Sequence, residues 1–407
     1  MSTKVDLNNI NLENLNQLTK EELINIVLDL KEQKGTHKKC VRKTIKPKLN
    51  RSFDFTKYQK RHVAFKLLYL GWNYQGFATQ DVTEKTIEHE LFRALTKCCL
   101  IESRQTSNYH RCGRTDKGVS SFSQVISLTV RSNGEDDSSE LLYCKMLNCL
   151  LPKDIRIIAW SPVNEGFSAR FDCGSRTYKY WFPRGDLDVD IMNQALQQLV
   201  GTHDFRNLCK MDVANGVVQY FRRIMSANVK ICFENNQFSN NRNYDMCELT
   251  IVGKAFLWHQ IRCIVSVLIL VGQHKENENI FKELLNIESC PRKPQYSLAD
   301  DLPLNLFDCE FENVNWIIED ESLFEIISSL QSSWATHMIK ATMMGEMLKN
   351  MDILAINKIN NQSEWLIQGV KSKMYQPLLK RPASESLENR IEHYTKKEKL
   401  KLECKDK

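Results

Sequence analysis

Apolar and polar positions alternate along two stretches in the first part of the chain, and a period of two is typical of β-strands. One stretch covers 62–70, and the other begins at Phe122. Between them, apolar side chains recur from Ile87 to Cys98 with the spacing of one helical face. The first unit is therefore expected to contain a strand at 62–70, a helix at 87–98, a strand at 122–130, a helix at 141–150 and a strand at 155–160.

A similar order of elements recurs in the second part of the chain, without sequence identity between the two parts. We expect a strand at 176–182, a helix around 191–199 that ends before Gly201, a loop at 201–205, strands at 223–233 and 246–252, a buried helix at 256–271 and a further helix at 280–287. Strands and helices in this order indicate an α+β fold with the helices against a sheet. Two such units side by side could share one long sheet and leave a cleft between them.

The two ends of the chain differ from this central part. Thr19 and Glu22 form a capping box ahead of a short amphipathic helix, and a basic linker follows at 31–51. Such a linker is either a solvated tether, a nucleic-acid contact or a nuclear-import signal. The tail is mostly helical by composition and closes in a lysine-rich end. The expected divisions are 1–51 for the helix and linker, 62–165 and 166–311 for the two units, and 312–407 for the helical extension with its basic tail.

Composition places the chain among globular proteins with a hydrophobic core. Of its 407 residues 42% are hydrophobic, and the formal net charge is +6. The 14 cysteines include no C-x-x-C pair, and the chain starts without a signal peptide, so we expect reduced, buried thiols and neither disulfides nor a zinc site. The longest apolar run, 261–272, is too short to cross a bilayer, which favours a soluble protein without a membrane partner.

The segment from Arg111 to Val119 carries the strongest candidate for chemistry. Gly113 and Gly118 bracket Asp116, and both allow backbone turns that a side chain would block. We expect the neighbouring basic residues Arg111, Arg114 and Lys117 to lower the pKa of Asp116 and keep it ionised. An ionised carboxylate held on a tight loop can act as a nucleophile or as an electrostatic stabiliser. The alternative is a surface turn that an Asp116–Arg114 pair holds in place.

Two further positions could contribute to the same site. Tyr178 shares one face of its strand with Arg176 and Tyr180, where a tyrosine either packs in the core or offers a stacking surface for an unstacked base. Arg262 lies at the head of an apolar helix, where a structural ion pair with a nearby acid is the simplest expectation.

Four motifs, spread over about 62–308, together resemble the TruA family of tRNA pseudouridine synthases. They are Gly113-Arg114-Thr115-Asp116-Lys117-Gly118-Val119, Ser168-Ala169-Arg170-Phe171 followed by Arg176-Thr177-Tyr178, Gly201-Thr202-His203-Asp204-Phe205, and Ala255-Phe256 with His259 and Arg262. Ser120 stands where bacterial members usually have a histidine. The resemblance implies that Asp116 is the nucleophile, that Arg262 pairs with it, assisted by Arg114, and that Tyr178 packs on the target uracil. It gives His259 the role of a structural neighbour.

The segments 103–108, 375–378 and 385–393 are also similar to one eukaryotic branch of the family, which modifies the 3′ side of the tRNA anticodon arm. This resemblance implies isomerisation of uridine at positions 38 and 39 without a cofactor or a metal, tRNA as the partner, and a homodimer. It implies two ferredoxin-like subdomains that share a long mixed, mainly antiparallel sheet, with helical extensions at both ends. The alternatives are a catalytically silent protein that binds structured RNA, or an enzyme that acts on another tRNA site or on messenger RNA. Both nucleus and cytoplasm are expected locations.

Overall fold

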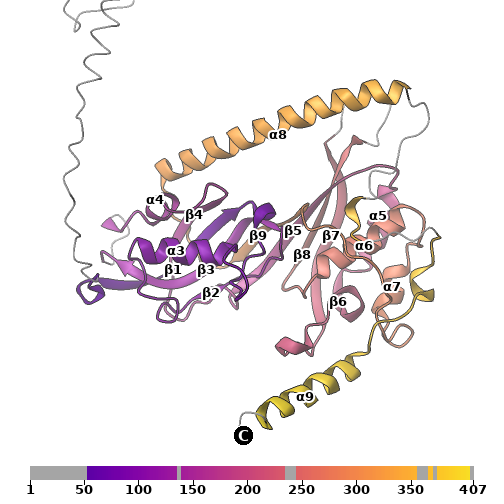
Figure 1. Cartoon of the computed structure of the whole chain (residues 1–407), viewed down its shortest axis with the longest axis horizontal. Coiled ribbons are helices and arrows are strands. Elements are labelled where there is room, and N and C mark those ends of the chain that lie inside the picture. The colour runs from indigo at the N-terminus through magenta and orange to yellow at the C-terminus, as the bar shows by residue number, and fades with distance from the viewer. Residues whose placement is uncertain (1–52, 135–138, 234–243, 355–364, 370–373, 404–407) are drawn as a thin grey trace, which may run out of the picture. The chain divides into compact units, whose positions relative to one another are not determined.

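A computed structural model describes residues 53–134, 139–233, 244–354, 365–369 and 374–403 (Figure 1). The chain divides into two compact units, Met1–Asp54 and Phe55–Lys407, and every element below belongs to the second. The predicted amphipathic helix and the basic linker at 31–51 lie outside the described residues, so the roles considered for them stay predictions. The nuclear and cytoplasmic location likewise stays a prediction.

One nine-stranded sheet runs through the second unit, in the order β4-β1-β3-β9-β5-β8-β7-β6, with β2 paired to β3. Its strands are β1 (Gln59–Tyr69), β2 (His110–Arg111), β3 (Ser120–Ser132), β4 (Ile155–Pro162), β5 (Cys173–Pro183), β6 (Gly201–Asp204), β7 (Phe221–Phe233), β8 (Met246–Gly253) and β9 (Leu304–Phe311). All of these pairings are antiparallel except that of β3 with β9. The expected α+β fold with one long, mainly antiparallel sheet is confirmed.

Strand β9 joins the two halves of the sheet. It pairs in parallel with Ser120 and Ser121 of β3 and antiparallel with β5 on its other side. The sequence analysis did not anticipate this strand, and it read 201–205 as a loop where β6 forms. Strand β9 is stabilised by neighbours from distant parts of the sequence, which a local pattern does not reveal, and β6 is only four residues long.

Helices cover the sheet and close a separate core in each half. Five α-helices are interspersed with the strands along this part of the chain: α3 (Ile87–Lys97), α4 (Tyr143–Asn148), α5 (Val189–Gln197), α6 (Gln260–Gly272) and α7 (Ile280–Leu285). In the first half, Ile87 and Leu91 of α3 pack with Phe65 of β1 and Ile126 of β3. In the second half, α6 is buried along almost its whole length. It begins at Gln260, later than the predicted 256, because Gly253 is followed by a loop that carries Trp258 into the site.

The C-terminal extension is mostly helical where it is described, as predicted. Helix α8 (Asp320–Leu354) comes after β9 in the sequence, and α9 (Leu387–Glu403) lies near the end of the chain (Figure 1). Glu319 accepts hydrogen bonds from the backbone N–H groups of Cys144 and Lys145 in the first turn of α4. Leu366 and Leu378 are fully buried in the core of the second half, so the extension completes that core. Within the described parts of the chain, no helix is both long and apolar enough to cross a bilayer.

A Gly71→Ala substitution should destabilise the protein by about 2–3 kcal/mol, because an added Cβ would lie 1.9 Å from the carbonyl oxygen of Val119. Gly166→Ala is the matched control, since nothing lies within 4 Å of its added Cβ. Urea unfolding of both variants measures the effect. Equal stability of Gly71→Ala and the control would contradict the close approach of these two segments.

Candidate active site

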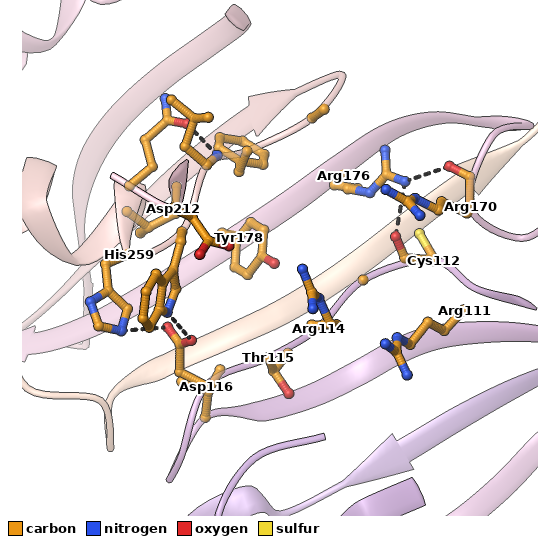
Figure 2. Close-up of a pocket in the computed structure, with 18 of the residues that line it drawn as sticks. Arg111, Cys112, Arg114, Thr115, Asp116, Arg170, Arg176, Tyr178, Asp212 and His259 are labelled. Atoms are coloured by element: carbon orange, nitrogen blue, oxygen red, sulfur yellow. Dashed lines mark hydrogen bonds and ion pairs between the residues drawn. The ribbon is translucent and has the colours of Figure 1, made fainter. Parts of the chain in front are cut away.

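A cavity of about 1010 Å³ lies where the two halves of the sheet meet (Figure 2). Its walls come from the Asp116 loop between β2 and β3, from β5, and from the loop before α6. Arg114, Asp116, Tyr178 and Arg262, which the sequence analysis named as site residues, all line this cavity. The fold therefore brings together residues from both halves of the chain.

Backbone geometry and a buried glutamine hold the Asp116 loop. Gly118 has a φ of +77°, and a Cβ there would lie 2.4 Å from Oδ1 of Asp301, so the position requires glycine as predicted. Gly113 has no such need. Its N–H instead donates to Oε1 of Gln124 at 3.1 Å, and its carbonyl accepts from Nε2 of the same side chain at 3.1 Å. A fully buried β3 side chain thus fixes the start of the loop.

Two side chains of the loop before α6 contact the Asp116 carboxylate. Nε1 of Trp258 donates a hydrogen bond to Oδ1 at 3.1 Å, and Nε2 of His259 lies 3.5 Å from Oδ2. Burial raises the pKa of Asp116 above its ordinary value, while the charge of Arg262 and the Trp258 hydrogen bond oppose that rise in part. The expectation of a lowered pKa was therefore wrong in direction.

The expected source of that lowering was also wrong. Arg111 is engaged by Glu88, a fully buried carboxylate on α3. Arg104 holds the second oxygen of the same carboxylate at 3.2 Å. Of the three expected basic neighbours, Arg111 therefore pairs with another acid, across 23 positions that spacing along the chain does not show.

His259 contacts Asp116 as a neutral group at neutral pH. Burial, together with the positive charge of Arg262, lowers the pKa of His259 to about 4. The contact therefore joins a neutral imidazole to the carboxylate, and His259 places no positive charge beside it. His259 has a φ of 60° at the N-cap of α6, a conformation that directs the loop towards the cavity.

Arg262 is 4% exposed and binds elsewhere than expected. Its Nε donates to the carbonyl of Ala299 at 2.8 Å, and its Nη2 lies 3.5 Å from Oδ2 of Asp301. Among the residues that the structure describes, no ion pair within 4.0 Å joins it to Asp116, so the expected direct pair is not formed. Its charge still favours the ionised form of both Asp116 and Asp301.

Tyr178 presents its ring to the cavity from β5. The ring meets that of Phe256 edge-on, with centroids 5.1 Å apart and planes at 85°, and it is only partly buried. Burial raises the pKa of Tyr178 well above 10, so its hydroxyl stays neutral. Tyr180, two residues on, is fully buried and donates to the carbonyl of Asp300 at 3.1 Å, which makes it a core residue.

The cavity wall is strongly basic. Nine arginine and lysine side chains line it, against the two carboxylates of Asp116 and Asp212. Arg114 is exposed and has no hydrogen bond or ion pair to any described residue, so it is available to a ligand. Lys210, whose amine lies 4.2 Å from the centroid of the Trp258 ring, was missed by the sequence analysis, as was Trp258 itself. Only the position of Trp258 inside the motif at 255–262 could have indicated its role. A basic cavity wall of this kind is suited to binding the phosphate backbone of a nucleic acid.

Comparison with known proteins gives the site a context. A family model described as tRNA pseudouridine synthase matches residues 195–312, a range that includes His259 and Arg262. The human tRNA pseudouridine(38/39) synthase is 47% identical over 387 residues, which cover 87% of this chain and 80% of the human protein. The enzyme of the same name from Saccharomyces cerevisiae is 37% identical over 380 residues, covering 88% and 81%. The tRNA pseudouridine synthase A of the archaeon Methanosphaera stadtmanae is 31% identical over 282 residues, covering 68% and 94%.

The pKa of the Asp116 carboxyl should lie above the ordinary aspartate value, and Trp258→Phe should raise it further, because the variant removes a hydrogen bond that favours the ionised form. Carbon-detected NMR titration of protein labelled at aspartate measures both values. Trp181→Phe, which removes an indole hydrogen bond to Glu248 and does not line the cavity, is the control and should leave the Asp116 titration unchanged. A lower pKa in Trp258→Phe would contradict the assigned contact.

Proposed function

Because the chain belongs to the TruA family of tRNA pseudouridine synthases, we propose that it isomerises uridine at positions 38 and 39 of tRNA, with Asp116 as the nucleophile. The names of the human and yeast relatives carry these positions. The observation that supports the role of Asp116 most is its placement. It is the carboxylate at the floor of a basic cavity, and it faces the same space as the Tyr178 ring (Figure 2).

The reaction rearranges atoms that the substrate already holds. The bond between C1′ of the ribose and N1 of the uracil breaks, and C1′ bonds to C5 of the same base. C5 loses a proton and N1 gains one, so the reaction needs no external reactant. Asp116 attacks either the ribose or the uracil ring. A partly buried carboxylate with a raised pKa is a more basic nucleophile than a solvated one.

The other cavity residues prepare the carboxylate and the base. Trp258 and His259 hold the two oxygens of Asp116, and the Arg262 charge favours its ionised form. The target uridine leaves the anticodon stem-loop, which costs least where bases are weakly stacked. Tyr178 replaces the lost stacking with its ring, and the free guanidinium of Arg114 binds a phosphate next to the extruded nucleotide.

We also propose that the enzyme is a homodimer that associates through α8. From Trp334 to Asn350 this helix is exposed apart from part-buried Gly345. Trp334, Met338, Met343 and Met347 lie along one face of it, together with smaller side chains. A contiguous apolar stripe of this length is uncommon on a monomer. A second copy of the same helix would cover it with equal chemistry.

Asp116→Asn should lower the rate of pseudouridine formation by at least about 10⁴-fold and leave tRNA affinity within a few-fold, because it removes the nucleophile and keeps the side-chain shape. The test incubates full-length protein with unmodified tRNAs that carry uridine at positions 38 and 39. It then maps pseudouridine by nucleotide position. Asp212→Asn, which alters the other carboxylate in the cavity wall, is the control and should keep its activity.

Normal turnover by Asp116→Asn would overturn the nucleophile assignment. Pseudouridine at another tRNA position, or in messenger RNA only, would favour the alternative targets. Binding of tRNA without any pseudouridine, by the unchanged protein, would favour a silent RNA-binding protein.

Tyr178→Phe should keep activity within a few-fold of the unchanged enzyme, whereas Tyr178→Leu should lose about 10–100-fold, because stacking of a base on an aromatic ring contributes about 1–3 kcal/mol. Single-turnover rates with saturating enzyme measure the loss. An equal loss in both variants would assign the role to the hydroxyl, and no loss in Tyr178→Leu would remove Tyr178 from the site.

Met338→Glu should shift the protein from dimer to monomer and raise the dimer dissociation constant at least about tenfold, because it places a charge in the proposed apolar contact. Lys340→Glu, on the opposite face of α8, should leave the dimer intact. Sedimentation equilibrium of the three proteins decides the question. A monomeric unchanged protein at micromolar concentration would rule out the interface.

A further inference from the structure

Three buried thiols from distant parts of the chain meet below the cavity. Cys112 belongs to the loop that carries Asp116, Cys173 is the first residue of β5, and Cys309 lies in β9. Their sulfur atoms all lie within 4.8 Å of one another, and the Sγ atoms of Cys112 and Cys309 are 3.4 Å apart. Each residue is at most 5% exposed. In the part of the chain that the structure describes, this is the one group of three or more metal-ligating side chains at such distances.

Arg176 gives the cluster an unusual electrostatic setting. This arginine of β5 is 9% exposed and donates hydrogen bonds to the backbone carbonyls of Cys112, Arg170 and Lys254. Among the described residues, no carboxylate lies within 4.0 Å of its guanidinium. A buried positive charge without a negative partner is costly, and the groups near it that can become anionic are the three thiols and the Tyr178 hydroxyl. The positive charge of Arg176, bonded to the Cys112 carbonyl, is placed to balance thiolates that bind a cation.

We propose that Cys112, Cys173 and Cys309 bind a zinc ion as thiolates. Three thiolates and Zn²⁺ carry a net charge of −1, which Arg176 balances. Zinc–sulfur bonds of about 2.3 Å in tetrahedral geometry place the sulfurs roughly 3.8 Å apart, so a small opening of the Cys112–Cys309 contact accommodates the ion. Cys112 and Cys173 line the cavity, so its water can occupy the fourth position. Binding releases the thiol protons and is therefore favoured by rising pH.

A zinc ion bound to these three thiolates would fix the position of the Asp116 loop. Cys112 precedes Asp116 by four positions, Cys173 opens the strand that carries Tyr178, and Cys309 lies in the strand that joins the two halves. A zinc ion bonded to all three would tie the nucleophile loop to the base-stacking strand. The ligands are positioning residues, and the ion takes no part in the reaction. The sequence analysis expected no zinc site because it judged spacing along the chain, whereas these ligands come together only through the fold.

The test begins with full-length protein that has been reduced and freed of metal by a chelator. Zinc titration should show one tightly bound ion per chain, and X-ray absorption should show three sulfur neighbours at about 2.3 Å. Cobalt substituted for zinc should give the visible spectrum of a tetrahedral thiolate site. Zinc should also raise the melting temperature, since it binds the folded state.

Cys112→Ser, Cys173→Ser and Cys309→Ser should each abolish stoichiometric zinc binding. Cys247→Ser changes an equally buried thiol in the core of the second half and should retain zinc binding.

Alkylation of the native, unchanged protein provides a readout that does not depend on variants that fold. Mass spectrometry should find Cys112, Cys173 and Cys309 protected by zinc and reactive without it. No stoichiometric zinc in the unchanged reduced protein, a Cys112–Cys309 disulfide in its place, or equal loss of binding in Cys247→Ser would each overturn the proposal. These outcomes are independent of the proposed reaction, because none of them measures pseudouridine.

Discussion

The short pairing of β3 with β9 is the constraint on which the site depends. Only Ser120 and Ser121 of β3 pair with β9, and the hydroxyl of Ser121 adds a hydrogen bond to the Leu306 carbonyl at 2.7 Å. On its other side β9 pairs with β5 along most of its length. This strand therefore sets the distance between a loop of the first half, which carries the carboxylate, and a strand of the second half, which carries the aromatic ring. Arg176 strengthens the same junction by binding the carbonyl of Cys112 at 3.0 Å.

Charge in the cavity is arranged so that the carboxylate stays available. Two arginines near Asp116 are each occupied by another acid, Arg111 by Glu88 and Arg262 by Asp301, while Arg114 has no ion pair to any described residue. The ionised form of Asp116 is therefore favoured by the charge of Arg262, which is not in direct contact with it, and by one hydrogen bond from the neutral indole of Trp258. A tight ion pair would lower its basicity and block its oxygens. Burial instead raises the pKa of Asp116 and so increases its basicity. Other basic side chains of the cavity wall stay accessible to phosphates.

Most of the fold could be predicted from the sequence, because it rests on local patterns. Motifs that resemble a known family pointed to Asp116, Tyr178 and Arg262, which line one cavity, but not to Trp258 or Lys210. Alternation revealed β1 and β3, helical spacing revealed α3 and α6, and the glycines around Asp116 marked its loop. What failed depends on contacts between distant segments. Strand β9 exists through its neighbours, the partner of Arg111 lies on a helix that precedes it, and the partner of Arg262 follows it by 39 positions, at Asp301. The direction of the Asp116 pKa followed the burial of the loop, which sequence spacing does not contain.

The central claim is that Asp116 acts on a uridine that has left the RNA stack and lies against Tyr178. A crystal structure of the Asp116→Asn protein bound to a tRNA anticodon arm with uridine at position 39 tests this most directly. The account predicts the uracil against the Tyr178 ring, with the side chain of residue 116 about 3–3.5 Å from the ribose C1′ or from the uracil ring. A target uridine that stays stacked in the RNA, or that lies in another part of the protein, would contradict it.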